Sequence, residues 1–382
     1  MDFDEYIRHG EPDKQEKASL WRTAIGLQAV DGLETSSYLK ETARRHIEGE
    51  ITIDQARQQI KLYYQSKTER EPDEDVKQEA DKVSANITKI LSSPSLDFSA
   101  KGLISVHRRI FDGVFKYAGR IRDYDITKKE WVLEDDTVHY LNWEDLRKAL
   151  DYDIEQERGF SYTGLSPDEL MAHITRFVSG LWQIHPFCEG NTRSTAVFTI
   201  LYLREIGLKV NNEMFANHSW YFRNALVRAN YRNVVKGIDY TPIYLERFFR
   251  NLLLGEQWDL RSRYLHIHPS QEWSVQPNLG DPASTLQVPY KYPTSTLQVL
   301  DGNWRMKKLV QAIGEQQLSM KSMLAALGLR DRVNFLNLYL MPSIQEGLVL
   351  MLYPDSPRHP RQKYLLSAKG LALYHEKGEP LR

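Results

Sequence analysis

Ten consecutive residues, HPFCEGNTRS from His185 to Ser194, bring an imidazole, a carboxylate, an amide and a guanidinium close together. The imidazole of His185 can accept a proton from a hydroxyl, because its reference pKa of about 6.5 lies near working pH. The carboxylate of Glu189 suits Mg²⁺ that is shared with phosphates. The guanidinium of Arg193 can hold phosphate oxygens through two N–H groups. This set predicts phosphoryl or nucleotidyl transfer, in which positioning and charge neutralisation lower most of the barrier.

Two helices must position these groups. Residues 166–184 begin with a serine cap and carry an apolar residue every three or four positions, which predicts a helix. The proline after His185 ends that helix, since proline lacks a backbone donor and disfavours a helical residue before it. Gly190 and Asn191 suit a sharp turn into a second, apolar helix that starts at Asn191 or Thr192 and should be buried on nearly every side. The N–H groups left free at its start predict an anion site that fits phosphate.

The ten residues resemble the core motif of the Fic family, HPFx(D/E)GNGRxxR, whose members mostly transfer AMP from ATP to a protein hydroxyl. The resemblance continues upstream in VHRRIFDGVFKYAGRIRDYDITKKEWVL and downstream in YFRNALVRAN. It implies a mainly α protein with a Fic-type helical core and a short β-hairpin flap. That catalytic domain would occupy residues 96–254.

The resemblance also implies what individual residues do. His185 would be the general base on the target hydroxyl, and Glu189 would hold Mg²⁺ or Mn²⁺. The flap would pair with an extended target segment by strand addition. The residues that would bind ATP are Phe187, Cys188, Glu189, Gly190, Asn191, Thr192 and Arg193, with Phe222 and Asn230 at the adenine. The flap residues that would dock the target are Ile126, Thr127, Lys128, Trp131 and Val132.

Two positions depart from the family pattern. Thr192 replaces a glycine, and because a β-branched residue at positive φ is costly, the backbone there should already be helical. Ala196 stands where the family has a second arginine that holds the terminal phosphate of ATP. Its absence removes a contact worth about 1.5–3 kcal/mol, so ATP should bind more weakly or in another pose.

Residues 1–65 predict short amphipathic helices that resemble the inhibitory, antitoxin-like module of many Fic proteins. The family's inhibitory pattern (S/T)xxxEG is replaced here by LQAVDG, with Leu27 and Asp31 at the two key positions. Asp31 could inhibit by contacting Arg193, the helix could simply occlude the site, or the aspartate could be a solvated or capping residue. Residues 66–95 predict a charged linker that becomes helical.

The C-terminal part predicts a linker over residues 255–300, in which STLQV occurs twice, and a winged helix over residues 301–382. Helices there precede two β-like stretches around a basic tip, DSPRHPRQ. The helix over RVNFLNLYLMPSIQEG is largely apolar, whereas a helix that reads a DNA groove offers several polar side chains. We therefore favour a protein-interaction or homodimer wing, with DNA binding as the alternative.

Composition limits the remaining options. No apolar run approaches the roughly 18 residues of a membrane span, and the acidic start is unlike an export signal. A single cysteine excludes an intramolecular disulfide framework, which together with these features predicts a cytoplasmic protein without membrane contact. The net charge of −1 gives no global field that would steer nucleic acid.

The sequence thus predicts a protein adenylyltransferase that uses ATP and Mg²⁺ (or Mn²⁺) to modify a Tyr, Thr or Ser hydroxyl of a protein target, which could include itself. One alternative is a DNA- or protein-binding regulator whose Fic domain binds nucleotide but turns over little. The other is a Fic enzyme that uses another donor or removes AMP.

Overall fold

Several helix starts in this chain carry side-chain caps. The hydroxyl of Ser36 accepts the N–H of Leu39. Thr52 and Gln55 exchange side-chain and backbone hydrogen bonds, and Ser166 forms a capping box with Glu169 behind a proline at the first helical position. Of these three caps, the serine at position 166 was predicted from the sequence and is confirmed. The three caps open α3 (Ser37–Ile47), α4 (Ile53–Ser66) and α8 (Pro167–Ile184).

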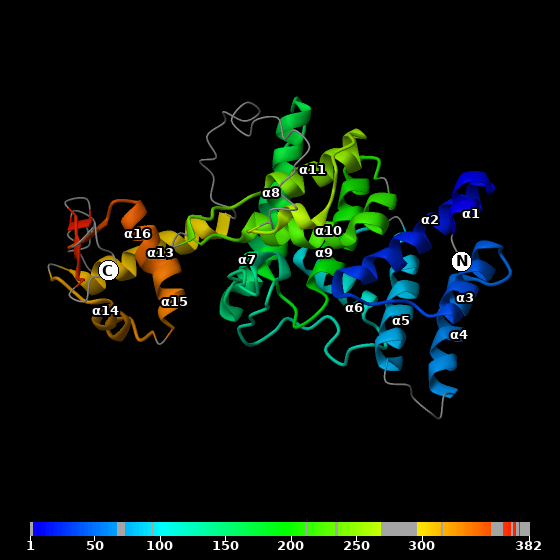
Figure 1. Ribbon diagram of the computed structural model, residues 1–382, viewed down its shortest axis with the longest axis horizontal. Coiled ribbons are helices and arrows are strands. Elements are labelled where there is room, and N and C mark those ends of the chain that lie inside the picture. Colours follow the sequence, from blue (N-terminus) through cyan, green and yellow to red (C-terminus); the bar gives the residue numbers. More distant parts are fainter. Residues whose placement is uncertain are drawn as a thin grey trace. The chain divides into compact units, whose positions relative to one another are not determined.

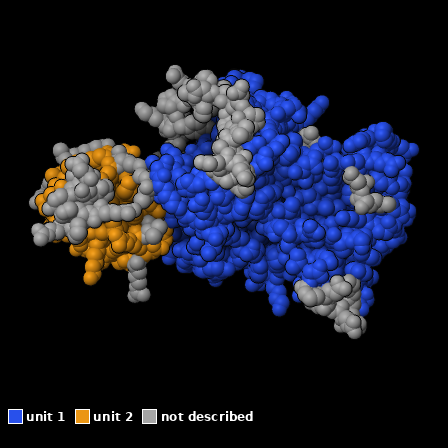
Figure 2. Space-filling model, viewed as in Figure 1, with its two compact units in different colours: residues 1–290 blue, residues 291–382 orange. Residues whose placement is uncertain are grey.

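The computed structural model describes residues 3–66, 73–93, 95–210, 212–233, 236–268, 296–314, 316–329, 331–352, 362–367, 370, 371 and 374. Two compact units, residues 1–290 and 291–382, divide the chain (Figure 2). Their boundary falls inside the linker expected over residues 255–300. The fold is mainly α, as predicted, and among the described residues no helix is long and apolar enough to span a membrane.

The N-terminal helices, blue in Figure 1, belong to the same compact unit as the predicted catalytic segment, residues 96–254. Trp21 is fully buried on α2, and its indole N–H donates to Nδ1 of His46. Asp81 of α5 accepts hydrogen bonds from Ser36 and Tyr64, which joins α5 to α3 and α4. Because α2 also packs on α5 and α10, these helices dock on the core rather than stand apart. The helices introduced here are α1 (Asp4–His9), α2 (Pro12–Gly26), the 3₁₀ turn η1 (Leu27–Asp31) and α5 (Glu74–Leu91).

Helix α9 is the centre of the core. Every residue from Asn191 to Leu203 is buried, which confirms the expectation of an enclosed helix. Helices α5, α6 and α8 pack against it. The elements of the core are α6 (Ala100–Ile110), η2 (Trp131–Leu133), η3 (Trp143–Asp145), α7 (Leu146–Arg158), α9 (Asn191–Glu205), α10 (Asn212–Asn230), α11 (Ile243–Phe249), the π-helical turn η5 (Arg250–Leu254) and η6 (Ser262–Leu265).

The expected β-hairpin at the flap is wrong. Residues 120–142 contain the 3₁₀ turn η2 and no strand. The physical reason is tight turning within the segment: the N–H groups of Leu133 and Asp135 both donate to the carbonyl of Glu130, and Glu134 and Asp135 have left-handed backbone, which a strand excludes. The backbone N–H of Glu130 instead closes a turn onto the carbonyl of Asp136 at 3.0 Å.

The second unit has helices followed by a two-stranded antiparallel hairpin, the element order expected for a winged helix. Val349 pairs with Leu366 in that hairpin. The predicted apolar helix is continuous but contains a π-helical turn, with Tyr339 and Leu340 buried. Residues 355–361 of the basic tip and the first STLQV copy lie outside the described residues. The elements are α13 (Thr296–Ile313), α14 (Met320–Ala326), α15 (Arg332–Phe335), η8 (Leu336–Leu340), α16 (Met341–Gln345), β1 (Val349–Met351) and β2 (Tyr364–Leu366).

One buried carboxyl makes the stability of the core depend on pH. Asp153 of α7 is buried with no hydrogen-bond partner for Oδ1 among the described residues, and burial raises its pKa from 3.8 to about 7. The folded state therefore holds this proton more tightly than the unfolded state, and stability falls as pH rises from about 4 to about 7. We expect Asp153→Asn to raise the free energy of unfolding by roughly 1–3 kcal/mol near pH 8 and to change it little near pH 4, measured by urea unfolding.

The matched control for this prediction is Asp151→Asn on the same helix, an exposed carboxylate that pairs with Arg147. It should leave stability nearly unchanged at both pH values, because exposed ion pairs contribute little. An effect of Asp153→Asn that is equal at the two pH values contradicts the prediction.

Candidate functional site

The loop between α8 and α9 is bounded by two residues with left-handed backbone. His185 follows α8 with φ 50° and ψ 59°, and Gly190 precedes α9 with φ 76°. A Cβ at Gly190 would lie 2.1 Å from Cζ of Phe111, so this position needs glycine both for its φ and for the close contact. The predicted end of the first helix and the start of the second at Asn191 are confirmed.

The amide of Asn191 closes the loop on itself. Its Oδ1 accepts the backbone N–H of Phe187 at 2.9 Å, and its Nδ2 donates to the carbonyl of Phe187 at 2.7 Å. Thr192 lies inside α9, as its β-branched side chain predicts, and its hydroxyl accepts the indole N–H of Trp182 at 3.0 Å. Both side chains therefore support the loop rather than face a ligand. The backbone N–H groups of Asn191, Thr192 and Arg193 have no acceptor within the helix, which leaves them suited to an anion.

Two residues outside the motif hold the loop from the other side. Nδ1 of His107 accepts the N–H of Gly119, so Nε2 carries the hydrogen and donates to the carbonyl of Glu189 at 3.0 Å. Burial lowers the pKa of His107 to about 4, which keeps this arrangement neutral. Arg122 donates from Nε to the carbonyl of His185 at 2.9 Å and from its backbone N–H to the carbonyl of Pro186 at 2.9 Å.

The sequence analysis assigned no role to His107 or Arg122. Both lie in the upstream segment that carries the family resemblance, one in VHRRIF and the other in AGRIR. Each residue therefore belongs to a segment that resembles the family, but no local spacing ties either of them to the loop more than sixty positions later.

His185 has the geometry of a base. Its ring Nδ1 lies 3.3 Å from the carbonyl of Trp182, while Nε2 is buried and has no hydrogen-bond partner among the described residues. Desolvation, followed by the nearby charge of Lys128, holds the pKa of the imidazole well below its ordinary value. A hydrogen on Nδ1 thus leaves the Nε2 lone pair free. The ring of Tyr140 stacks on one face of the imidazole at 3.9 Å, and because Nε2 is buried, a hydroxyl reaches it only after neighbouring groups shift.

The predicted metal ligand, Glu189, has a half-exposed carboxylate that pairs with Lys128 of the flap at 2.9 Å. In the described part of the chain, no group of three or more His, Cys, Asp or Glu side chains could hold a metal by itself. One accessible carboxylate still fits Mg²⁺, which keeps several waters and shares phosphate oxygens. Cys188, the neighbouring thiol, is half-buried.

Arg193 is buried and bound by the N-terminal helices. Its Nε lies 2.8 Å from Oδ2 of Asp31, and its Nη2 lies 2.8 Å from Oε1 of Glu79 on α5. Its Nη1 donates to Oε1 of Gln28 at 3.1 Å. We call Gln28, Asp31 and Glu79 the arginine clamp. The structure brings Asp31 to Arg193, one of the alternatives left open by the sequence, whereas Gln28 and Glu79 were not foreseen.

The remaining predicted residues are not brought to the loop. Phe222 is buried in a cluster of aromatic rings with Phe215, Phe248 and Phe249. Asn230 is buried, and its Nδ2 donates to the carbonyls of Ser179 and Leu226. The family resemblance implied that both side chains contact adenine, but both lie in the core of this protein. Among the flap residues, Val132 is buried and its carbonyl accepts the N–H of Ile267, whereas Thr127 and Trp131 are exposed and Ile126 is half-buried.

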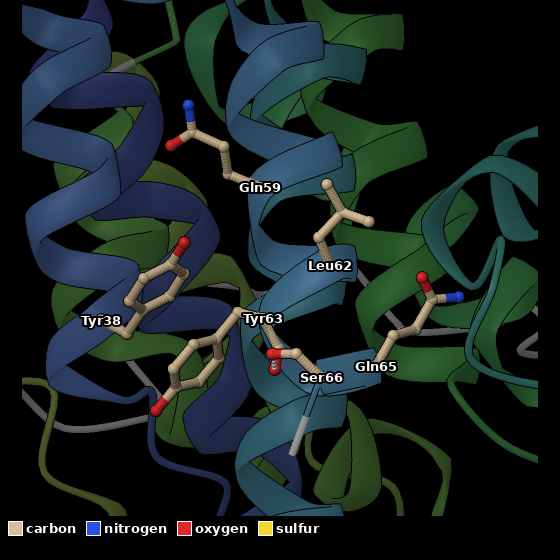
Figure 3. A pocket seen from close by; sticks show the side chains of 6 residues that line it. All are labelled: Tyr38, Gln59, Leu62, Tyr63, Gln65 and Ser66. Atoms are coloured by element: carbon tan, nitrogen blue, oxygen red, sulfur yellow. Dashed lines mark hydrogen bonds between the residues drawn. The ribbon is translucent and has the colours of Figure 1, made fainter.

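A shallow cavity on the N-terminal helices lies away from these residues. Figure 3 shows Tyr38 of α3 facing Tyr63 of α4, with the two rings parallel at 3.9 Å. The other lining side chains come from α4, and none of them was predicted to act at the site. They are Gln59, Leu62, Gln65 and Ser66.

Comparison with known proteins gives two family matches. Residues 97–203 match the Fic/DOC family, and residues 305–367 match the C-terminal domain of the Fic-like family named for filamentation induced by cAMP. Protein adenylyltransferase VbhT of Bartonella schoenbuchensis is 24% identical over 195 residues, which cover 47% of this chain and 40% of that protein. The match thus spans about two fifths of the length of that curated relative.

Solved structures of Fic proteins are also similar to the chain. A Fic family protein from Desulfovibrio desulfuricans G20 is 18% identical with a TM-score of 0.41, over 97% of this chain and 90% of that one. BepC from Bartonella tribocorum with bound AMPPNP is 17% identical with a TM-score of 0.37, over 48% of this chain and 87% of that one.

The contact between Gly190 and Phe111 gives a test of the loop. We expect Gly190→Ala to lower the free energy of unfolding by at least about 2 kcal/mol, since it adds a clash with a buried ring to a strained φ. The measurement is urea unfolding followed by circular dichroism. Gly164→Ala is the matched control, because Gly164 also has positive φ but nothing lies within 4 Å of its added Cβ. Equal costs for the two variants would show that the Phe111 contact is unimportant.

Proposed function

This chain carries a Fic/DOC domain, and from that premise we propose that it is a protein adenylyltransferase. It transfers AMP from ATP to a Tyr, Thr or Ser hydroxyl of a protein target, which could be the chain itself. The observation that carries the proposal is the neutral imidazole of His185, with a free Nε2, beside the N-terminus of α9. Such an imidazole is a base, and a helix start attracts phosphate. The name of the Bartonella relative supports the same reaction class.

In the proposed reaction, the acceptor hydroxyl gives its proton to Nε2 of His185 while its oxygen bonds to the α-phosphorus of ATP. The bond from that phosphorus to the bridging oxygen breaks, and pyrophosphate leaves. The carbonyl of Trp182, at 3.3 Å from Nδ1, accepts a hydrogen bond from the ring and stabilises its protonated form. Mg²⁺ or Mn²⁺ at Glu189 would neutralise charge on the phosphates. The loop amides orient those phosphates.

The contacts around the loop also support a resting state held by the N-terminal helices. The arginine clamp engages the one motif guanidinium, and Tyr140 covers His185. We therefore propose that these helices inhibit the reaction through Asp31 and Glu79, because a polyphosphate must displace carboxylates to reach Arg193. A carboxylate pair on a single buried guanidinium also repels an incoming anion.

A second candidate function is a regulator that binds nucleotide and turns over little, which Ala196 favours because no second arginine is present. A third keeps catalysis but changes the donor or direction. The same assay separates all three.

The assay uses ATP labelled on either the α- or the γ-phosphate, with Mg²⁺ or Mn²⁺, beside His185→Ala. We expect protein labelling from the α position only, and a loss of at least about 100-fold in His185→Ala, since general base catalysis contributes that much. Label from the γ position indicates phosphorylation instead. No label from either position, in a protein that still binds ATP, favours the regulator.

Releasing the arginine clamp should raise activity. We expect Asp31→Asn combined with Glu79→Gln to increase the rate of AMP transfer at least about fivefold, because both charges that compete with phosphate are removed while side-chain size is kept. Asp13→Asn is the control, as this carboxylate of α2 pairs with Lys17 and does not touch Arg193. A thermal melt of each variant shows whether it is folded. An unchanged rate in a folded double variant contradicts inhibition through the clamp.

A further inference from the structure

The resemblance implies that a cation at position 196 holds the distal phosphates of ATP, and this sequence has an alanine there. Ala196 is fully buried on α9, so no side chain from this position reaches a ligand. Arg193, the other arginine of the motif, is bound by the arginine clamp. Even when the clamp releases Arg193, its guanidinium replaces only one of the two arginines of the family pattern, so a second cation for the end of a triphosphate must come from elsewhere in the fold.

Two further arginines near His185 are already committed. The guanidinium of Arg122 is fully buried and donates to three backbone carbonyls, those of His185, Tyr124 and Leu141. Arg223 pairs at 2.8 Å with Glu130, whose side chain is fully buried. Removing either arginine from its partner would leave a buried polar group without a partner, which costs far more than a phosphate contact repays. Neither can move to a ligand.

Lys128 differs from these arginines in the partner it holds. Its Nζ lies 2.9 Å from Oε2 of Glu189, and the two side chains are 26% and 49% exposed. An ion pair of this exposure contributes little to stability, so the ammonium can leave it at small cost. Its charge is also the second cause, after desolvation, that lowers the pKa of His185, which sets the ammonium beside the proposed base.

We propose that Lys128 binds the terminal phosphates of the nucleoside triphosphate and so supplies the charge that position 196 lacks. This inference rests on the proposed function, since it concerns the donor of that reaction. In the resting protein Lys128 neutralises Glu189. When a metal ion binds Glu189, the ammonium is released and its flexible four-carbon stem lets it turn to the phosphates. The flap thus contributes to donor binding, and Lys128 is a specificity residue for a polyphosphate tail.

The experiment is isothermal titration with ATP and with AMP in the presence of Mg²⁺. The background carries His185→Ala, to prevent turnover, and Asp31→Asn, to loosen the clamp. We expect Lys128→Ala to weaken ATP binding about tenfold and AMP binding less than about twofold, because only ATP carries the distal phosphates. Lys128→Arg, which keeps the charge, should stay within about threefold of the background for ATP.

Lys129→Ala is the matched control, since Lys129 is the adjacent, exposed lysine with the same charge. Equal ATP affinities for the Lys128→Ala and Lys129→Ala proteins overturn the inference while leaving the proposed function standing. Equal losses for ATP and AMP overturn it as well, because they assign Lys128 to another part of the nucleotide. A loss confined to the apparent affinity for a protein target assigns Lys128 to target docking and also overturns it.

The labelling assay separates this inference from the proposed function. Lys128-dependent ATP binding in a protein that transfers no AMP supports the inference and rejects the adenylyltransferase. Absence of ATP binding in the background protein rejects both.

Discussion

The site depends on the closure of one short loop by its own asparagine. Because Asn191 uses both amide groups on the backbone of Phe187, the chain turns from α8 into α9 within a few residues. That turn forces left-handed backbone at His185 and Gly190 and points the first N–H groups of α9 into the loop. The position of the imidazole and the anion site are therefore two consequences of the same constraint. A looser connection would leave the imidazole and the first N–H groups of α9 without a fixed separation.

Support for this loop comes from groups whose charge or protonation is fixed by burial. His107 is neutral because burial lowers its pKa to about 4, and only the neutral ring can accept from Gly119 while donating to Glu189. Arg122 is charged, but its guanidinium donates hydrogen bonds to backbone carbonyls. It therefore holds the loop and the flap and does not face a ligand. Both residues act on the backbone of the motif and so determine where its side chains point. Their contribution is to positioning, not to chemistry.

The parts of the structure that could be predicted are those that depend on residues close together in the sequence. Caps at Ser36, Thr52 and Ser166, and the proline after His185, act within a few residues, so they could be recognised in the sequence. The predicted flap hairpin is wrong because the segment turns back onto the carbonyl of Glu130, a contact that the spacing of residues does not reveal.

Long-range contacts set the limit of prediction at the site. Glu79 lies in a stretch that was predicted to be a charged linker. Its contact with Arg193 joins two residues that are 114 positions apart in the sequence. Under the proposed function, nucleotide and the N-terminal helices would compete for the same guanidinium, so the two equilibria would be thermodynamically linked. A ligand that displaces Asp31 and Glu79 from Arg193 weakens the docking of those helices. The docked helices weaken the binding of that ligand by the same factor. Under the proposed function, a change that moves α2 or α5 would therefore act on the phosphate site through the side chain of Arg193. Regulation of the loop then need not involve the loop's own residues.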